Sequence, residues 1–308
     1  MSGSEETFLT LLKKKCQNCT KGTLKVYHSS IRRLYRLLHP DATTVPTTKA
    51  WLMSDELFEK YKSTPTNARR HLAMGAYKAT QAYNIKPENK WYAAMIQSQA
   101  QYQEQRNKNE PSEKEKGLLP KQGLKAIKRS AIELKKRLKY LFTDEPTKSN
   151  IYRIQMWLAL KLMAEIPFRN DLPTINVKEK KGNHLVKSKS GYKIVMVDYK
   201  NSDRLGPREI NVSRAGSMAI TKFLNMRNKV IDHDMLLSNK NGTPMSKSAF
   251  GKSLQNTTEK LLGKRIGSRI LRIVFSSDPS NRKTIEKAAE ISNKLLHTAK
   301  QTAQYIRK

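Results

Sequence analysis

The spacing of apolar residues between positions 121 and 142 is the strongest constraint on how this chain folds. Steps of 3, 4, 3, 4 and 3 residues separate Leu124, Ile127, Ala131, Leu134, Leu138 and Leu141. This spacing keeps them on one face of an α-helix, and the remaining positions are largely Lys and Arg. We therefore predict a helix that packs along one face and is cationic along the other.

The cationic face of this helix has two interpretations. Lys125, Lys128 and Lys135 would bind DNA if the helix lies along a phosphate backbone, and would contact only water if the face is merely solvated. The whole chain favours a polyanionic partner, because 60 Lys and Arg against 26 Asp and Glu leave a net charge of +34. Nucleic acid is therefore the first partner to consider.

A membrane surface is the rival polyanion. No apolar run approaches the roughly 18 to 20 residues of a spanning helix, and the first residues, MSGSEETF, have no signal-peptide pattern. We therefore expect an intracellular protein that has no membrane partner.

The only cysteines, Cys16 and Cys19, form a C-x-x-C pair. Zinc needs four ligands, and the distances from Cys19 to His28 and His39 match no common zinc finger. A redox pair would need a strand-to-helix context that this polar stretch lacks, and two cysteines cannot define a disulfide framework. We predict no metal site here.

Residues 1–110 show helical patterns and no strand pattern. In residues 20–39, Thr20 or Thr23 can cap a helix, and Arg32 and Arg33 lie on its outer, basic face. The packing face of that helix comprises Leu24, Tyr27, Ile31, Leu34 and Leu38. Ser54 is the expected cap of a further helix. We predict a small helical domain over residues 1–110, with Arg32 and Arg33 available to bind DNA.

A linker is expected over residues 111–120. The stretch 102–117 has almost nothing to bury and contains Pro111 and Gly117. We place a second domain over residues 121–308.

The second domain is predicted to be rich in helices, with one small sheet. Residues 151–166 are apolar nearly all round, so they predict a buried helix that ends before Pro167. Residues 175–212 carry β-branched runs broken by turns, which predicts two or three antiparallel strands. Helical patterns then cover residues 213–228, 246–262, 266–277 and 283–296, with Ser246 as a cap and Gly263 as a stop. The predicted fold class is mainly α with a small antiparallel β-sheet (α+β).

The motifs of common phosphate-handling enzymes are absent from the sequence. It has no G-x-x-x-x-G-K-[ST] loop, no H-E-x-x-H and no G-x-S-x-G, and its Asp and Glu residues are scattered. Most enzymes that cut nucleic acid hold Mg²⁺ with clustered carboxylates. If this protein breaks phosphodiesters, we expect it to do so without a metal ion or another cofactor.

Phosphoryl transfer without a metal needs cations, a general acid and a nucleophile. Arg269 and Arg272 lie three apart on a predicted helix, so both guanidinium groups project from one face. Arg169 follows the buried helix, and Lys200 lies where a strand meets a hairpin turn. His297 and Tyr305 lie eight residues apart near the end. Each residue alone fits an ordinary surface or packing role, and their order is what favours a shared site.

This order resembles the tyrosine recombinases, the family of phage integrases, resolving recombinases and yeast-type flippases. EIPFRNDL resembles the family's first arginine box and gives Arg169, and DYKNSDRLGPREINV resembles its lysine hairpin and gives Lys200. SRILRIVF resembles the second arginine box and gives Arg272, and LLHTAKQTAQY resembles the last box and gives His297 and Tyr305. The resemblance covers most of the chain and is strongest over residues 151–308. The boxes look closest to those of integrases carried by large DNA viruses, virophages and related mobile elements.

The resemblance implies a site-specific recombinase in which Tyr305 forms a 3′-phosphotyrosine. Arg169, Arg272 and Arg269 would stabilise the phosphate, Lys200 would be the general acid, and His297 would assist. It also implies a helical core-binding domain, double-stranded DNA as the partner and a homotetramer on two duplexes. The protein would work with DNA in a host nucleus, viral factory or cytoplasm.

Two positions depart from the family pattern. Arg269 stands where the family most often has a histidine, so we expect His297 to be the better proton acceptor. Only three residues follow Tyr305, so assembly contacts are expected to come from elsewhere, or the tyrosine segment itself is exchanged. The rival functions are a type IB topoisomerase-like DNA relaxase and a catalytically degenerate DNA-binding protein of the same fold.

Overall fold

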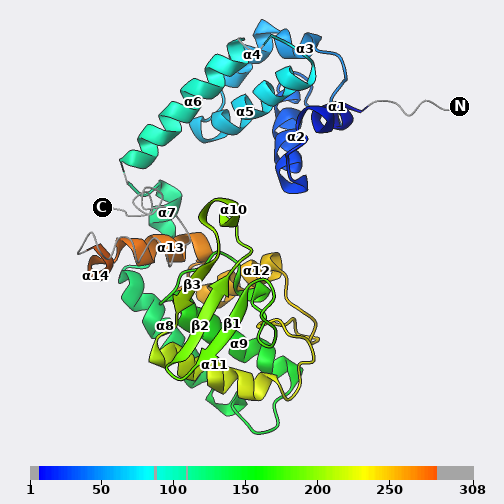
Figure 1. The fold of residues 1–308 in the computed structure, drawn as a ribbon. Helices are drawn as coiled ribbons and strands as arrows, with labels where there is room; N and C mark the ends of the chain where they lie inside the picture. Colours follow the sequence, from blue (N-terminus) through cyan, green and yellow to red (C-terminus); the bar gives the residue numbers. More distant parts are fainter. Residues whose placement is uncertain (1–6, 87–88, 109, 283–308) are drawn as a thin grey trace, which may run out of the picture. The chain divides into compact units, whose positions relative to one another are not determined.

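The chain divides into two compact units, Met1–Lys108 and Asn109–Lys308. The computed structural model describes residues 7–86, 89–108 and 110–282. Each unit has its own apolar core. Figure 1 shows helices throughout the first unit, and helices with one sheet in the second.

The first unit is built from six described helices. They are α1 (Phe8–Lys15), α2 (Lys21–Tyr35), α3 (Ala50–Met53), α4 (Asp55–Lys62), α5 (Thr66–Ala82) and α6 (Lys90–Asn107). Thr20 caps α2 and Ser54 caps α4, because each side chain accepts a hydrogen bond from a backbone N–H in the first turn. Both caps confirm the sequence predictions.

Aromatic side chains hold the first unit together. The indole of Trp91 is fully buried and donates to the carbonyl of Leu52 at 2.8 Å. The indole of Trp51 donates to the hydroxyl of Tyr83 at 3.2 Å, and burial raises the pKa of Tyr83 to about 12.

A disulfide joins Cys16 and Cys19 between the end of α1 and the cap of α2. This bond was not predicted from the sequence.

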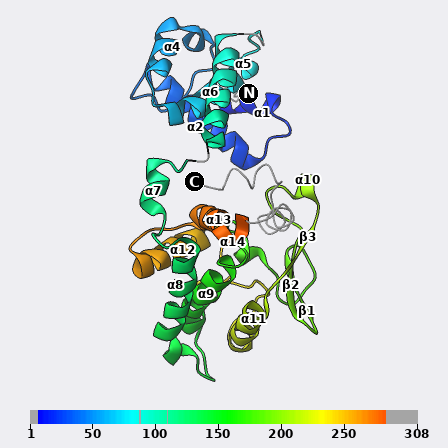
Figure 2. The ribbon, with the colours of Figure 1, turned by 90° about the vertical axis from the view of Figure 1, so that its left-hand side faces the viewer.

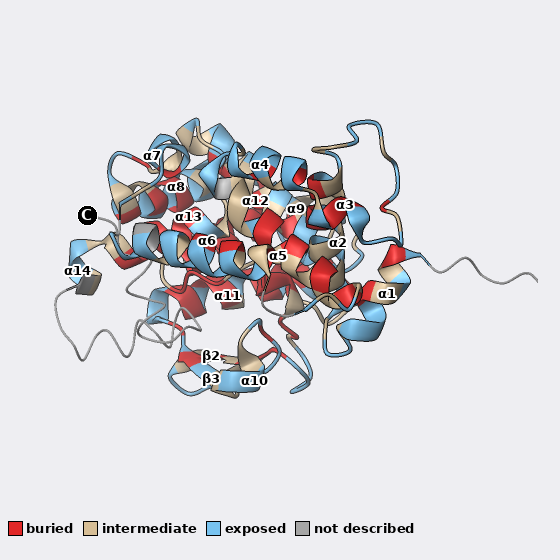
Figure 3. Ribbon diagram, turned by 90° about the horizontal axis from the view of Figure 1, so that it is seen from above, coloured by how far each residue is buried: buried red, intermediate tan, exposed pale blue. Residues whose placement is uncertain are grey.

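Up to residue 282, where the described part of the second unit ends, five long helices surround one core. They are α8 (Gly123–Arg137), α9 (Lys148–Met163), α11 (Arg214–Arg227), α12 (Lys247–Leu262) and α13 (Ser268–Ser277). Shorter helical segments are α7 (Glu113–Leu118), η1 (Lys139–Leu141), η2 (Leu172–Thr174), α10 (Ser202–Leu205) and α14 (Pro279–Arg282). In the view of Figure 3, buried residues follow α9 and α13, whereas much of α6 is exposed. The apolar character of α9 therefore makes it the centre of the second core.

Three antiparallel strands form the sheet, in the order β1 (His184–Ser188), β2 (Gly191–Met196) and β3 (Arg208–Asn211). Leu185 pairs with Ile194, which pairs with Ile210. Ile194, Met196 and Ile210 are buried, because alternate residues of a strand face the same side. Figure 2 shows the sheet edge-on beside α11. The hydroxyl of Ser217, on α11, accepts a hydrogen bond from the N–H of Tyr192 in β2. The α+β fold class is confirmed.

Residues 111–120, expected to be a linker, contain the short helix α7. Its cap is a capping box: Ser112 accepts from the N–H of Glu115, and the Glu115 carboxylate accepts from the N–H of Ser112 at 2.9 Å. The side chain of Glu115 is only 3% exposed. This polar stretch, which was expected to have almost nothing to bury, therefore contains one buried carboxylate.

A buried arginine fixes the loop that follows α11. Arg227 is fully buried and donates to the backbone carbonyls of His233 and Met235. His233 Nδ1 accepts hydrogen bonds from Arg227 Nη2 and from the N–H of Met235, each at 3.1 Å. The imidazole is therefore neutral, with its proton on Nε2.

Acid is expected to weaken this loop through His233. Burial, followed by the Arg227 charge, lowers the pKa of His233 in the folded protein, against the opposing effect of Asp234 and Asp232. The unfolded chain binds the proton more readily, so this contribution to stability is present above pH ~6.5 and declines as the pH falls below it. Urea unfolding at pH 7.5 and 5.5 tests this: His233→Gln should lose part of the native pH dependence, and exposed His71→Gln should keep it. Equal pH dependence in native and His233→Gln proteins would contradict the assignment.

Candidate active site

Arg169 lies in a tight loop after α9. The loop is anchored by Ile166 and Phe168, which are 0% and 1% exposed. The Asp171 carboxylate accepts from Lys247 Nζ at 2.7 Å, which ties the loop to the start of α12. The amide of Asn170 lies where a side chain on Gly251 would be, 2.8 Å from an ideal Cβ. Arg169 itself is half-buried. Its backbone is held by the buried Phe168 before it and by the contacts of Asn170 and Asp171 after it.

Glu165 ties the same loop to α11. Its carboxylate accepts hydrogen bonds from the Ser213 hydroxyl at 2.7 Å and from the Ser213 N–H. Ser213 also caps α11. A carboxylate beside a helix N-terminus is favourable, because the unsatisfied N–H groups there carry partial positive charge. The Arg169 loop is thereby attached to both α11 and α12.

Lys200 lies in the connection between β2 and β3 and is exposed. Asn183 organises the base of this connection: its Oδ1 accepts from the N–H groups of Val197 and Asp198, each at 2.8 Å. Tyr199 is buried, and its hydroxyl donates to the carbonyl of Gly206 at 2.7 Å. These contacts form the base of a connection that presents an exposed lysine between two strands. The connection contains the helix α10, whereas the sequence predicted a hairpin turn.

Arg272 lies on α13, where most neighbouring side chains are buried. Ile270, Leu271 and Ile273 are at most 5% exposed, and Arg272 is 6% exposed. Thr258 fixes the start of α13, because its hydroxyl donates to the carbonyl of Ile266 at 3.1 Å and accepts from the N–H of Ile266 at 2.9 Å. α12 therefore positions α13, and with it Arg272.

Arg269 lies one turn before Arg272 and has a different environment. Its side chain is 63% exposed, and Nη2 donates to Glu115 Oε1 at 2.6 Å. The motif order predicts a phosphate contact for Arg269, and Glu115 is not among the predicted site residues. The available signal was the S-x-x-E pattern at Ser112–Glu115, which is typical of a capping box.

His297 and Tyr305 lie outside the described residues. Of the predicted catalytic set, the structure places Arg169 in the loop after α9, Lys200 in the connection between β2 and β3, and both Arg269 and Arg272 on α13. Figures 1 and 2 show α10, which follows Lys200, and α13 at the same end of that unit. The roles of all six residues stay predictions.

The residues predicted to bind DNA lie on two helices. Arg32 is half-buried and Arg33 is exposed on α2, in the first unit. Lys125, Lys128 and Lys135 are exposed on α8, in the second.

Within the described ranges, no group of three or more His, Cys, Asp and Glu is placed to hold a metal ion. No helix described there has the length and apolar character needed to cross a membrane.

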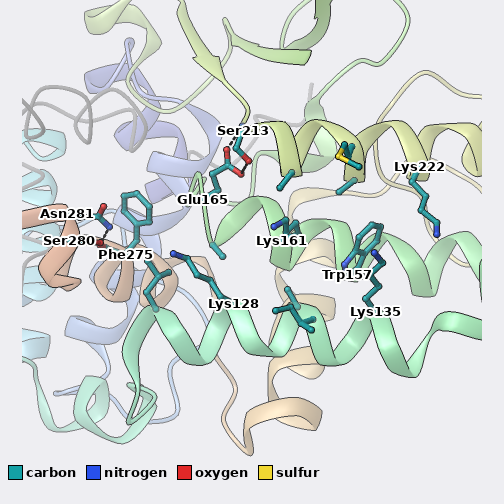
Figure 4. A pocket seen from close by; sticks show the side chains of 17 residues that line it. Lys128, Lys135, Trp157, Lys161, Glu165, Ser213, Lys222, Phe275, Ser280 and Asn281 are labelled. Atoms are coloured by element: carbon teal, nitrogen blue, oxygen red, sulfur yellow. Dashed lines mark hydrogen bonds between the residues drawn. The ribbon is translucent and has the colours of Figure 1, made fainter. Parts of the chain in front are cut away.

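A groove of about 800 Å³ runs between α8, α9 and α11. Its walls are largely apolar, and Ile132 and Met218 beside it are 59% and 66% exposed. Figure 4 shows Phe275, Ser280 and Asn281 at one end and Lys222 and Lys135 at the other, with Glu165 and Ser213 between them. The ammonium of Lys135 lies 5.5 Å from the Trp157 ring centroid, a cation–π distance. Lys135 therefore has a contact within the protein.

Two solved structures of DNA-bound proteins share this fold. One is the XerH site-specific recombinase bound to a palindromic difH substrate in a post-cleavage complex, with a TM-score of 0.57 and 14% identity. The match covers 98% of this chain and 81% of that chain. The other is the Tn1549 transposon integrase in complex with transposon right-end DNA, with a TM-score of 0.57 and 16% identity, covering 98% and 95%.

The fold is that of the tyrosine recombinases. No protein-family model and no curated protein matches the sequence, so the likeness rests on three-dimensional structure. A tyrosine-recombinase fold is what the order of the arginine, lysine, histidine and tyrosine boxes implied.

Proposed function

We propose that this protein is a site-specific DNA recombinase or integrase that cuts and rejoins strands through Tyr305. The observation that carries the proposal is a fold shared over nearly the whole chain with two proteins of DNA recombination, both solved on DNA. The predicted boxes supply the chemistry, and the net charge of +34 supplies the affinity for a polyanion.

In the proposed reaction, the Tyr305 hydroxyl attacks a backbone phosphorus, forming a 3′-phosphotyrosine and breaking the bond to the 5′-oxygen. Arg169 and Arg272 would stabilise the charge on the non-bridging oxygens. Lys200 would donate a proton to the departing 5′-oxygen, and His297 would assist the tyrosine. Rejoining reverses these steps with a 5′-hydroxyl as nucleophile. The phosphotyrosine bond retains the energy of the phosphodiester, so the strands can be rejoined without ATP, a metal ion or another cofactor.

The assembly and origin proposed for this protein follow the family resemblance. Four protomers would hold two duplexes, the two domains over residues 1–110 and 121–308 would close on DNA, and residues 111–120 would join them. The form of the boxes supports a protein encoded by a virus or mobile element, acting inside the cell where its DNA resides.

Binding of duplex DNA is expected to depend steeply on salt. Each phosphate neutralised by Lys or Arg releases counterions, so affinity should fall by roughly 100-fold or more between 50 and 200 mM salt. Fluorescence anisotropy measures this, and Lys125→Gln combined with Lys128→Gln should lower the salt slope by about 2. Lys62→Gln is the control, because Lys62 already pairs with Glu59 at 2.8 Å. An affinity that barely changes with salt would contradict phosphate binding.

Covalent trapping tests the proposed function. Duplexes drawn from the junctions of the encoding DNA, each with a nick near the candidate site, would be incubated with the protein in EDTA. We expect an adduct that survives denaturation. Binding of these duplexes without an adduct would instead favour a non-catalytic DNA-binding protein. Relaxation of supercoiled DNA by isolated protomers, with no exchange between two sites, would favour a type IB topoisomerase-like relaxase.

A further inference from the structure

The contact between Glu115 and Arg269 joins an almost buried acid to an exposed base. The Glu115 side chain is 3% exposed, while Arg269 is 63% exposed and reaches it at 2.6 Å. The second oxygen of the same carboxylate accepts from the N–H of Ser112 at 2.9 Å. Because α7 fixes the carboxylate and the guanidinium is the freer partner, Arg269 is the group that can exchange partners.

A second bond attaches α7 to the segment before α13. Lys264 Nζ donates to the carbonyl of Leu119 at 2.7 Å. Leu118 and Leu119 pack against the core of the second unit. α7 is therefore attached through Glu115 at its first turn and through Leu119 at its end. It is also the first helix after Asn109, where the second unit begins.

Carboxylates and phosphates compete for the same arginine donors. The planar guanidinium matches either group with paired N–H bonds. Arg269 lies three residues before Arg272, one turn away on the same helix. A phosphate bound near Arg272 would therefore be within the reach expected of the Arg269 side chain, whose present partner is a carboxylate of the opposite charge.

We propose that Glu115 is a positioning residue that holds Arg269 away from the DNA phosphate until the duplex competes for it. This inference rests on the proposed function, since it needs DNA at the Arg272 end of α13. The linker helix α7 then sets how much of the arginine charge is available to DNA. Removing the Glu115 charge releases Arg269, and tighter DNA binding follows.

Binding of a duplex by Tyr305→Phe protein tests this inference without cleavage. Glu115→Gln should bind about tenfold more tightly, because a charge-assisted bond no longer has to break. Glutamine preserves the capping box with Ser112, and thermal unfolding checks the fold. Glu113→Gln is the matched control: it removes the same charge from α7, but Glu113 pairs with Lys116 at 2.7 Å.

The double variant separates release of Arg269 from a general charge effect. Adding Arg269→Gln to Glu115→Gln should cancel the gain, leaving the affinity of Arg269→Gln alone. The inference is overturned if Glu115→Gln binds no more tightly than Glu113→Gln, or if its gain persists without Arg269. In both cases the protein still binds DNA, so the proposed function survives. Failure of every variant to bind duplex DNA overturns both proposals.

Discussion

Replacing Tyr305 by phenylalanine is expected to abolish covalent attachment to DNA while leaving DNA binding intact. The change removes one hydroxyl, the proposed nucleophile, and keeps the aromatic ring. On a nicked duplex in EDTA, native protein should accumulate an adduct that migrates with the DNA on a denaturing gel. The variant should give none, at equal occupancy of the duplex by anisotropy.

A second tyrosine provides the control for this experiment. Tyr92 is 40% exposed on α6, and Tyr92→Phe should form the adduct as the native protein does. An adduct with Tyr305→Phe would assign the nucleophile to another residue, which peptide mapping of the attached DNA would identify. The absence of an adduct from native protein that binds the duplex would remove both enzyme hypotheses.

Replacing Arg272 by alanine is expected to slow single-turnover cleavage by about 100- to 1,000-fold. The expectation follows from removing one charged donor that, in the proposed reaction, stabilises the transition state. Arg272 is 6% exposed on a helix whose start is fixed by Thr258, so the fold surrounds its side chain closely. Affinity for DNA should change much less than the cleavage rate. The measurement is the rate of adduct formation at saturating protein.

Two comparisons keep this result interpretable. Arg272→Lys retains the charge but not the paired N–H geometry, and should lie between alanine and native protein in rate. Arg265→Ala removes an exposed arginine that pairs with Glu259 at 2.6 Å, and should cleave at the native rate. Native-rate cleavage by folded Arg272→Ala would exclude Arg272 from the reaction.

The helices and their ends were largely predictable from the sequence, because local spacing and capping determine them. Ser246 caps α12, and Gly263 ends it with a left-handed φ of 66°, which glycine adopts without strain. The 3.6-residue period over 121–142 correctly placed the buried side of α8, but α8 ends at Arg137 and the 3-10 helix η1 covers Lys139–Leu141. Thr20 and Ser54 likewise marked the first turns of α2 and α4.

Contacts between distant residues were not predictable in the same way. Glu115 and Arg269 are 154 residues apart, and no local pattern specifies which side chain of α13 meets the carboxylate of α7. The Arg227 guanidinium and the carbonyls it binds likewise depend on how the loop after α11 folds back. Arg169, Lys200 and Arg272 were proposed through the order of short boxes, since their individual surroundings resemble those of many basic residues.

The packing of Asn170 against Gly251 limits which sequences can carry the Arg169 loop. A Cβ at position 251 would lie 2.8 Å from the Asn170 amide nitrogen, a distance at which the Asn170 side chain, the loop or the helix must shift. In a library of variants selected for activity, position 251 would accept few replacements although it bears no reactive group. A glycine on α12 therefore restricts which substitutions the loop tolerates, although the proposed chemistry belongs to Arg169, the neighbour of Asn170.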